Sequence, residues 1–433
     1  MSNNGHHPFT KFRLLERSSP TLPGLPDLEG EIRQALDGLA IPRERLAGRR
    51  IAVTAGSRGI AHLREIVKAA CDWLKAQGAH AFVVPAMGSH GGATAEGQRL
   101  ILEEYGVTAE AVGAEVKSDM DTVPLGETPE GFQVCMDRNA WEADSVLVLN
   151  RIKPHTDFSG SIESGLLKMI AVGLGKRGGA AETHRWSRRY GNERVIRAIA
   201  GVTLSTGKIL CGLAVAENEM HQIAIVRAAL PEGIVALEEA TLPVARSLVS
   251  RLPFSKCHLL VVDEMGKNIS GTGMDTKVVG RGARPLPADA PEIDLIYVRD
   301  LTLESDGNSI GVGLADLIHE RFYRKIDLTK MYMNTRTSLN PMMARVPMHL
   351  ASDREALDYI VAILGSPDPA EQRVIWIQNT LELNRVAVSA SFAQEADAIG
   401  NWRLLEEEFS LHFDGRGDLV SPFERSSARA RAT

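Results

Sequence analysis

The stretch Arg50–Pro85, RIAVTAGSRGIAHLREIVKAACDWLKAQGAHAFVVP, decides the fold class. It begins and ends with short β-branched runs, Arg50–Thr54 and Ala81–Pro85, which are typical of buried strands. Between these runs, His62–Gln77 carries apolar residues about every 3.6 positions and stops at Gly78, as an amphipathic helix does. A strand, a helix and a second strand in this order predict a parallel sheet covered by helices.

The alternation of strands and helices continues toward the C-terminus. In the first half we expect a helix over Ala95–Tyr105, a strand over Ser145–Asn150 and a helix over Ile162–Val172. After Arg251-Leu252-Pro253 a second set begins, with expected strands at Cys257–Val262, Ile293–Val298 and Val374–Ile377 and expected helices at Val312–Arg321 and Glu355–Leu364. The sequence therefore predicts an α/β protein of two domains, residues 1–252 and 253–423, each a mostly parallel sheet covered by helices. A disordered tail is expected at 424–433.

The composition excludes several classes of protein. With 44% apolar and 24% charged residues over 433 positions, the chain can bury a large core without disulfides or a structural metal. Its 49 Lys and Arg against 55 Asp and Glu leave a formal charge of −6, which does not indicate a basic surface for binding nucleic acid. The cysteines lie far apart without zinc-ligand spacing, and no apolar run approaches the about 20 residues that span a bilayer. We expect a cytoplasmic protein that has no signal peptide and binds neither nucleic acid nor membrane.

Two glycine-rich segments match nucleotide-binding loops only in part. Ile51–Ala61, IAVTAGSRGIA, has alanine at two of the three glycine positions of the short-chain dehydrogenase turn, and no tyrosine of the chain is followed by lysine four residues later. Gly173–Gly179, GLGKRGG, has Ile170 and Arg177 where a phosphate-binding P-loop needs glycine and Ser or Thr. Both functions are excluded on these grounds.

Three histidines stand among small polar residues. His90 and His155 directly follow expected strands, where open α/β sheets bind their ligands, and His184 comes later in the chain. A single loop histidine is more often a solvated residue, but two in separate loops at strand ends can act as acid and base on opposite sides of one carbon. Lys168 stands alone in the apolar run SGLLKMIAVG, either as a functional amine or as a lysine that extends to solvent.

These residues belong to one longer motif. The run Asn150–Arg185, NRIKPHTDFSGSIESGLLKMIAVGLGKRGGAAETHR, together with GSHGG upstream, resembles the nickel-dependent lactate racemase family, whose members racemise or epimerise 2-hydroxy acids. The family pattern, P-H-x-x-F-x-G followed by a lysine and a histidine, is present as Pro154, His155, Phe158, Gly160, Lys168 and His184. The resemblance implies that residues 1–252 bind the cofactor and carry out catalysis. It also implies that residues 253–423 complete the substrate cleft between the domains.

The resemblance also implies a cofactor. In the family it is a nickel-pincer nucleotide, pyridinium-3,5-bisthiocarboxylic acid mononucleotide, which holds nickel in a plane. By this resemblance His184 supplies the fourth nickel ligand, Lys168 tethers the nucleotide as a thioamide, and His90 and His155 are the catalytic pair. Arg58 matches an arginine near cofactor and substrate. The expected partners are a small 2-hydroxy acid and the enzymes that make and load the cofactor, and homo-oligomerisation stays open.

Further contacts are expected from glycine-rich turns. Such turns expose backbone N–H groups that can bind anions, so we expect Ser57, Gly173, Gly175 and Lys176 to contact an anionic group, either the nucleotide phosphate or the substrate carboxylate. For Lys176 a solvated basic turn is the alternative. In the second domain, the polar loop Glu264–Thr276 offers Lys267 and Ser270 to the substrate, and a plain surface turn is the alternative there.

The chain departs from the lactate enzymes at positions that shape their substrate site. Ala55 stands where they have aspartate, and Ser270, Gly271 and Met274 replace a Tyr-Gln-x-x-Lys set, so the sequence indicates a 2-hydroxy acid other than lactate. Two further functions stay open. One is a pincer-dependent oxidoreductase or lyase, and the other is a nonenzymatic carrier of nickel or cofactor, which would not need His90 and His155.

Overall fold

The chain folds into two compact α/β units. The computed structural model describes residues 11–57, 59–156, 158–282, 289–338, 340–365, 368, 371–396 and 398–423. The N-terminal unit comprises Thr21–His155 and Ser159–Val249. The C-terminal unit comprises the described residues up to Pro20, Thr156–Phe158 and the chain from Ser250 onward. Among the described residues, no helix is both long and apolar enough to cross a membrane.

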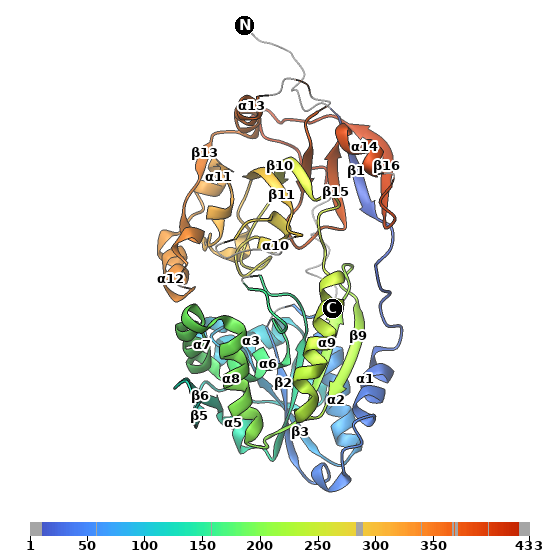
Figure 1. Ribbon diagram of the computed structural model, residues 1–433, viewed down its shortest axis with the longest axis vertical. Coiled ribbons are helices and arrows are strands. Elements are labelled where there is room, and N and C mark those ends of the chain that lie inside the picture. Colours follow the sequence, from blue (N-terminus) through green and yellow to red (C-terminus); the bar gives the residue numbers. More distant parts are fainter. Residues whose placement is uncertain are drawn as a thin grey trace. The chain divides into compact units, whose positions relative to one another are not determined.

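The N-terminal unit is built on a six-stranded sheet (Figure 1). The strands lie in the order β4 (Glu115–Val116), β3 (His80–Pro85), β2 (Arg50–Ala55), β7 (Ser145–Arg151), β8 (Ile209–Glu217) and β9 (Ile223–Ala229). All neighbours are parallel except β8 and β9. The central strands β2 and β7 are almost wholly buried, as expected of a parallel sheet covered on both faces. A separate hairpin joins β5 (Thr122–Glu127) to β6 (Gln133–Asp137).

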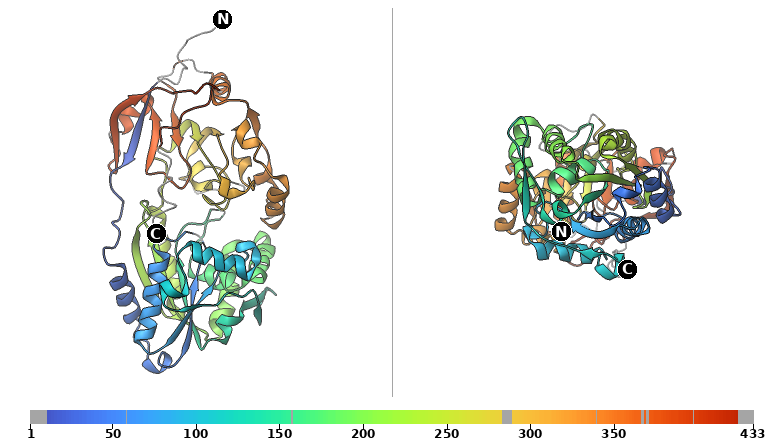
Figure 2. Two further views of the ribbon diagram at one scale, coloured as in Figure 1. Left: turned by 180° about the vertical axis from the view of Figure 1, so that it is seen from behind. Right: turned by 90° about the horizontal axis from the view of Figure 1, so that it is seen from below.

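Helices cover this sheet. They are α1 (Leu28–Asp37), α2 (Leu63–Ala76), α3 (Ala95–Glu104), α4 (Ala109–Val112), α5 (Arg138–Glu142), α6 (Leu166–Lys168), α7 (Lys176–Tyr190), α8 (Asn192–Ser205) and α9 (Ile234–Ser247). The reverse view in Figure 2 shows α1 and α2, in blue, side by side. They share one apolar core with β2, β3, β7 and β8. Helices α6 and α9 pack on β8, where Gly212 leaves room for Leu166 and Ile234.

The C-terminal unit holds a mixed eight-stranded sheet. Its order is β13 (Met348–Leu350), β12 (Leu317–His319), β11 (Glu292–Val298), β10 (Lys256–Val262), β14 (Val374–Ile377), β15 (Arg385–Ser389), β1 (Phe12–Arg17) and β16 (Trp402–Phe409). The first five strands are parallel and the last three pair antiparallel. Its helices are α10 (Thr276–Val279), α11 (Glu320–Tyr323), α12 (Leu328–Ser338), α13 (Asp353–Leu364) and α14 (Ala393–Ala396). Alternate residues of β10 enter two different apolar clusters, so both faces are buried.

The fold class predicted from the sequence is confirmed, but three local predictions are wrong. Strand β1 pairs with β15 and β16, so the first described residues belong to the C-terminal sheet rather than to a domain spanning residues 1–252. The helix expected over Ile162–Val172 starts only at Leu166, because Gly165 is extended. The helix expected over Val312–Arg321 is instead a short 3-10 turn followed by strand β12, which pairs with β11 and β13. The expected tail, 424–433, lies outside the described residues.

Candidate active site

Three loops of the N-terminal unit leave the same edge of its sheet. Strands β3, β2 and β7 are neighbours and run parallel, with Ala55 opposite Pro85 and Val53 opposite Leu147. Their C-terminal ends therefore meet at one edge, which is where parallel sheets bind ligands. Ser57 follows β2, His90 follows β3 and His155 follows β7. Arg58, which matches a family arginine near cofactor and substrate, lies outside the described residues.

His90 is held by the turn after β2. The Ser57 hydroxyl is hydrogen-bonded to Nδ1 of His90, and the Tyr105 hydroxyl donates to the Ser57 carbonyl at 3.2 Å. Tyr105 also accepts from the backbone N–H of Gly59 at 3.3 Å. When Nδ1 donates its proton to Ser57, Nε2 carries the lone pair that a general base needs. The partner of Ser57 is therefore the candidate base, rather than the phosphate that we expected.

The loop that carries His90 is fixed from inside the protein. Gln98, on α3, is fully buried and donates from Nε2 to the carbonyl oxygens of Gly88 at 3.0 Å and of His90 at 3.3 Å. The amide oxygen of Gln98 accepts from Lys176 Nζ at 3.2 Å. Because both ends of this amide are engaged, its orientation and the course of the loop are fixed together.

Lys176 corrects a prediction. We expected its amine at a phosphate, but the side chain is fully buried, and it donates to the Pro85 carbonyl at 2.6 Å as well as to Gln98. Its third partner is the buried carboxylate of Asp137, at 2.9 Å. Burial raises the pKa of Asp137 above its ordinary value, and Lys176 opposes that rise. A buried ammonium needs such partners, which are provided by the ends of β3 and β6.

A second buried group holds the loop after β7. Glu163 is fully buried and accepts from the backbone N–H of His155 and, at 3.4 Å, from that of Gly160. Its carboxylate is 2.6 Å from the Arg246 guanidinium, which also donates to the Gly160 carbonyl. The polypeptide from His155 to Gly160 is thus tied at both ends to one ion pair. Sequence reasoning missed Glu163 and Arg246, although an acidic residue inside the run SIESGLL was a signal.

Lys168 lies at the start of an unusual helical stretch. It ends α6 and is half-buried, and the next five residues, Met169–Gly173, form the π-helix η3, with Leu174 N–H donating to the Met169 carbonyl at 2.8 Å. Single π-turns occur frequently at functional sites. The stretch passes the end of β3, because a Cβ at Gly173 would lie 2.6 Å from the Ala86 oxygen. No local pattern in the sequence indicates this π-turn.

Gly173 and Gly175 were expected to form an open nest for a phosphate. Both are buried, and a Cβ at Gly175 would lie 2.6 Å from the Ala171 oxygen and 2.8 Å from Cα of Gly179. Gly173 therefore permits a close approach to the end of β3, and Gly175 permits close packing of η3 on α7. Their contact with an anion stays a prediction. His184, by contrast, is exposed on α7, where an imidazole is accessible to a metal.

The two substrate residues expected in the second half lie in the C-terminal unit, in the loop after β10. Lys267 Nζ donates to the Gly271 carbonyl at 2.8 Å. Ser270 is buried, and its hydroxyl is 3.2 Å from that of Thr272. Both side chains have partners inside their own loop, which fixes its shape. Their role at a substrate stays a prediction.

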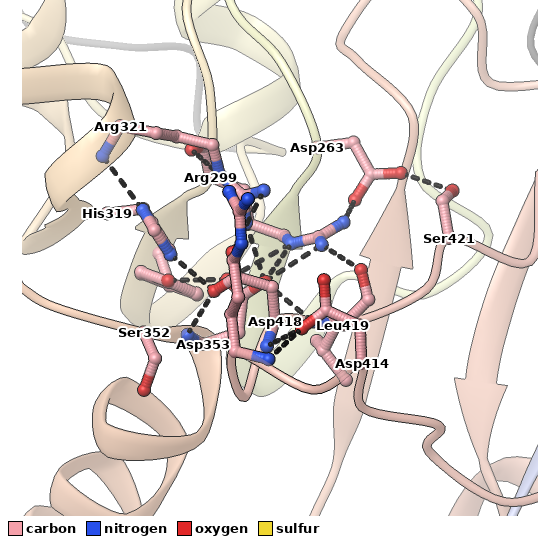
Figure 3. Close-up of polar contacts among 12 residues, drawn as sticks. Asp263, Arg299, His319, Arg321, Ser352, Asp353, Asp414, Asp418, Leu419 and Ser421 are labelled. Atoms are coloured by element: carbon pink, nitrogen blue, oxygen red, sulfur yellow. Dashed lines mark hydrogen bonds and ion pairs between the residues drawn. The ribbon is translucent and has the colours of Figure 1, made fainter.

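One other cluster has the residue types of a metal site. His319, Asp353 and Asp418 have ligand atoms within 4.8 Å of one another in the described C-terminal unit (Figure 3). However, His319 accepts from the Arg321 backbone N–H at Nδ1, 2.8 Å away, and its Nε2 is 2.7 Å from Asp418. Asp353 binds the guanidinium groups of Arg299 and Arg321 at 2.8 and 2.7 Å. With its ligand atoms engaged and two cations beside them, the cluster fits a structural ion network rather than a metal site.

Part of the chain is similar to a known protein family. Residues 26–194 match the family model of the lactate racemase N-terminal domain. The lactate racemase apoprotein from Thermoanaerobacterium thermosaccharolyticum has a similar fold, with 13% identity, a TM-score of 0.50 and coverage of 83% of this chain and 95% of that one. A protein from Thermotoga maritima gives 15% identity, a TM-score of 0.48 and coverage of 63% and 70%. No curated protein matches the chain. Residues 26–194 thus resemble the lactate racemase N-terminal domain, and the fold of the chain is similar to that of a lactate racemase apoprotein.

Proposed function

We propose that this protein is a racemase or epimerase of a 2-hydroxy acid and that it works with a nickel-pincer nucleotide. The observation that carries the proposal is the position of His90 and His155, which follow β3 and β7 at the same edge of one sheet. Both lie inside the segment that matches the family model. Each backbone is fixed by buried polar groups, as catalytic side chains require.

The residues present fit the proposed cofactor. Lys168 offers an amine, and the exposed His184 offers an imidazole suited to planar Ni(II). The backbone near His90 leaves room beside it, because a Cβ at Gly59 or Gly92 would meet no atom within 4 Å. When bound, this nucleotide supplies a reversible acceptor for the hydride on C2 of the substrate. Lys168 would hold it and His184 would ligate its nickel.

The two histidines would handle the hydroxyl proton. Inversion at one carbon needs a proton acceptor on one face and a proton donor on the other, and an imidazole with a pKa near neutrality can be either. For His90, the hydrogen bond between Nδ1 and Ser57 orients the ring, and Nε2 would be the nitrogen that exchanges the proton. For His155, the hydrogen bond from its backbone N–H to Glu163 fixes the position of the backbone from which the imidazole extends. The proposed partners are the 2-hydroxy acid and the enzymes that load the cofactor.

Chiral analysis of the reaction tests the proposal. Protein co-expressed with the cofactor-synthesis enzymes should convert one enantiomer of a 2-hydroxy acid to the other without accumulating keto acid. His90→Ala and His155→Ala should each lose about 10²- to 10⁴-fold in rate. His80→Ala is the matched control, because His80 is exposed at the opposite end of β3 and should keep full activity. Net keto-acid formation would support an oxidoreductase instead. Undiminished activity of both His90→Ala and His155→Ala would support neither the racemase nor the oxidoreductase.

A further inference from the structure

A buried carboxylate that the proposed reaction does not use lies under the segment of Lys168. Glu238, on α9, is fully buried, and its Oε2 accepts from the backbone N–H of Leu167 at 2.9 Å. Its other oxygen, Oε1, is buried without a hydrogen-bond partner in the described structure. A buried acceptor left unsatisfied costs stability, so such a residue needs an explanation beyond packing.

The backbone is shaped to receive this carboxylate. A Cβ at Gly165 would lie 2.4 Å from Oε1 of Glu238, so only glycine fits the position just before α6. The Gly165 carbonyl is in turn fixed by the Asn150 amide at 2.7 Å, from the end of β7. This is why the predicted helix begins at Leu166 instead of Ile162. The first turn before Lys168 is thus set by Glu238 and Asn150 together.

We propose that Glu238 is a positioning residue for Lys168, which fixes the backbone turn from which the lysine side chain starts, and that protonation of Glu238 weakens this contact. The inference rests on the role proposed for Lys168. An ionised carboxylate accepts from backbone N–H groups more strongly than a protonated one. The turn is therefore held more firmly when Glu238 is charged.

The surroundings of Glu238 favour titration in the physiological range. Burial raises the pKa of Glu238 to about 7, and the N–H groups of Leu167 and Leu166 oppose the rise. Arg197 on α8 also lowers it and the neighbouring Glu239 raises it. From β9, Arg227 binds Thr241 instead, at 3.0 Å. Since the pKa is higher in the folded than in the unfolded state, the contribution of protonated Glu238 to stability is fully present below about pH 4.5 and is lost as the pH rises to about 7.

Two measurements on cofactor-free protein test the inference, so they do not depend on racemase activity. The first is acetylation of Lys168 by N-hydroxysuccinimide acetate between pH 6 and 8.5, measured by mass spectrometry relative to the exposed Lys256. In the wild type, the ratio of the two labelling rates should change about fivefold around pH 7, as expected for one charge-assisted hydrogen bond. In Glu238→Gln the ratio should stay flat. Glu239→Gln is the matched control and should keep the change, centred at a slightly lower pH because Glu239 raises the pKa of Glu238.

The second measurement is the melting temperature. Glu238→Gln keeps the shape and one acceptor but carries no charge, so it should raise the melting temperature relative to the wild type by more at pH 8 than at pH 5.5. Equal effects at both pH values would show that Glu238 does not titrate there and would overturn the inference. So would a flat wild-type labelling ratio, or the same labelling profile in Glu238→Gln and Glu239→Gln. Loss of racemase activity alone would bear on the proposed function and not on this contact.

Discussion

The Ser57 hydroxyl is hydrogen-bonded to Nδ1 of His90, although the two residues follow different strands. This contact joins the turns after β2 and β3 and fixes the His90 ring through Nδ1. A histidine ring that is fixed through one nitrogen presents the other in a defined direction and tautomer. The relationship makes Ser57 an orienting residue for the candidate base.

Removing this hydroxyl should therefore affect catalysis more than stability. We expect Ser57→Ala to lower kcat by about 5- to 10-fold, the equivalent of one net hydrogen bond, with little change in KM. Ser57→Thr keeps the hydroxyl and should retain more of the activity. Nitrogen NMR of the His90 ring measures the tautomer directly. An unchanged ring spectrum in Ser57→Ala would show that the contact does not set the tautomer.

The buried ammonium of Lys176 should be a large contributor to stability. Lys176→Met leaves Asp137 buried without its cation, and we expect a loss of about 3–5 kcal/mol in the free energy of unfolding. The neighbouring Arg177 is exposed and gives a matched control. Arg177→Met should change the free energy of unfolding by less than about 0.5 kcal/mol. Denaturant unfolding measures both. A similar, small effect of the two substitutions would mean that Lys176 faces solvent, as the phosphate contact would require.

The ion pair of Glu163 and Arg246 should act on catalysis as a unit. Both groups bind the loop between His155 and Gly160, so Glu163→Gln and Arg246→Met should each lower kcat/KM. We expect a coupling energy of about 1–3 kcal/mol in the double-mutant cycle, because the two side chains share partners. Additive effects of the two substitutions would place the residues in independent roles.

The network around Asp353 predicts an acid-sensitive C-terminal unit. Burial raises the pKa of this carboxyl, but the Arg299 and Arg321 guanidinium groups more than offset the rise and hold it below its ordinary value. A carboxyl whose pKa is lowered on folding stabilises the fold above about pH 4, and this contribution is lost as the pH falls further. Asp353→Asn should therefore destabilise the protein at pH 7 by about 3–5 kcal/mol and flatten the decline of stability below pH 4. Calorimetry across this range checks both, and stabilisation of the wild type by added nickel through His319 would argue for a metal site instead.

The sequence predicted the parts of the fold that depend on local pattern. The segments around β2, α2 and β3 were predictable because a buried strand and an amphipathic helix each carry their own periodicity. The positions of His90 and His155 followed from the rule that ligand sites collect after parallel strands. Strand β12 was missed because its apolar residues also fit a helical spacing, and only pairing with β11 and β13 decides between the two.

The buried side chains behind the site could not be read from the sequence. Lys176 stands next to Arg177 and resembles a solvated basic turn, and its burial depends on Asp137 and Gln98 from other elements. In the same way, Gly165 is extended because Glu238 occupies the space of its missing side chain. Such contacts are tertiary, so no local periodicity records them.

The fate of the hydrogen on C2 tests the central claim most directly. Cofactor-loaded protein is incubated in ordinary water with single enantiomers of lactate, malate and mandelate that carry deuterium at C2. The products are separated by chiral chromatography, and the mass of each enantiomer is measured by mass spectrometry. We predict that the opposite enantiomer of at least one acid forms with its deuterium retained, and that His90→Ala and His155→Ala each slow this conversion by about 10²- to 10⁴-fold. Inversion with loss of the deuterium to water, or no inversion of any of these acids by the loaded protein, would contradict the account.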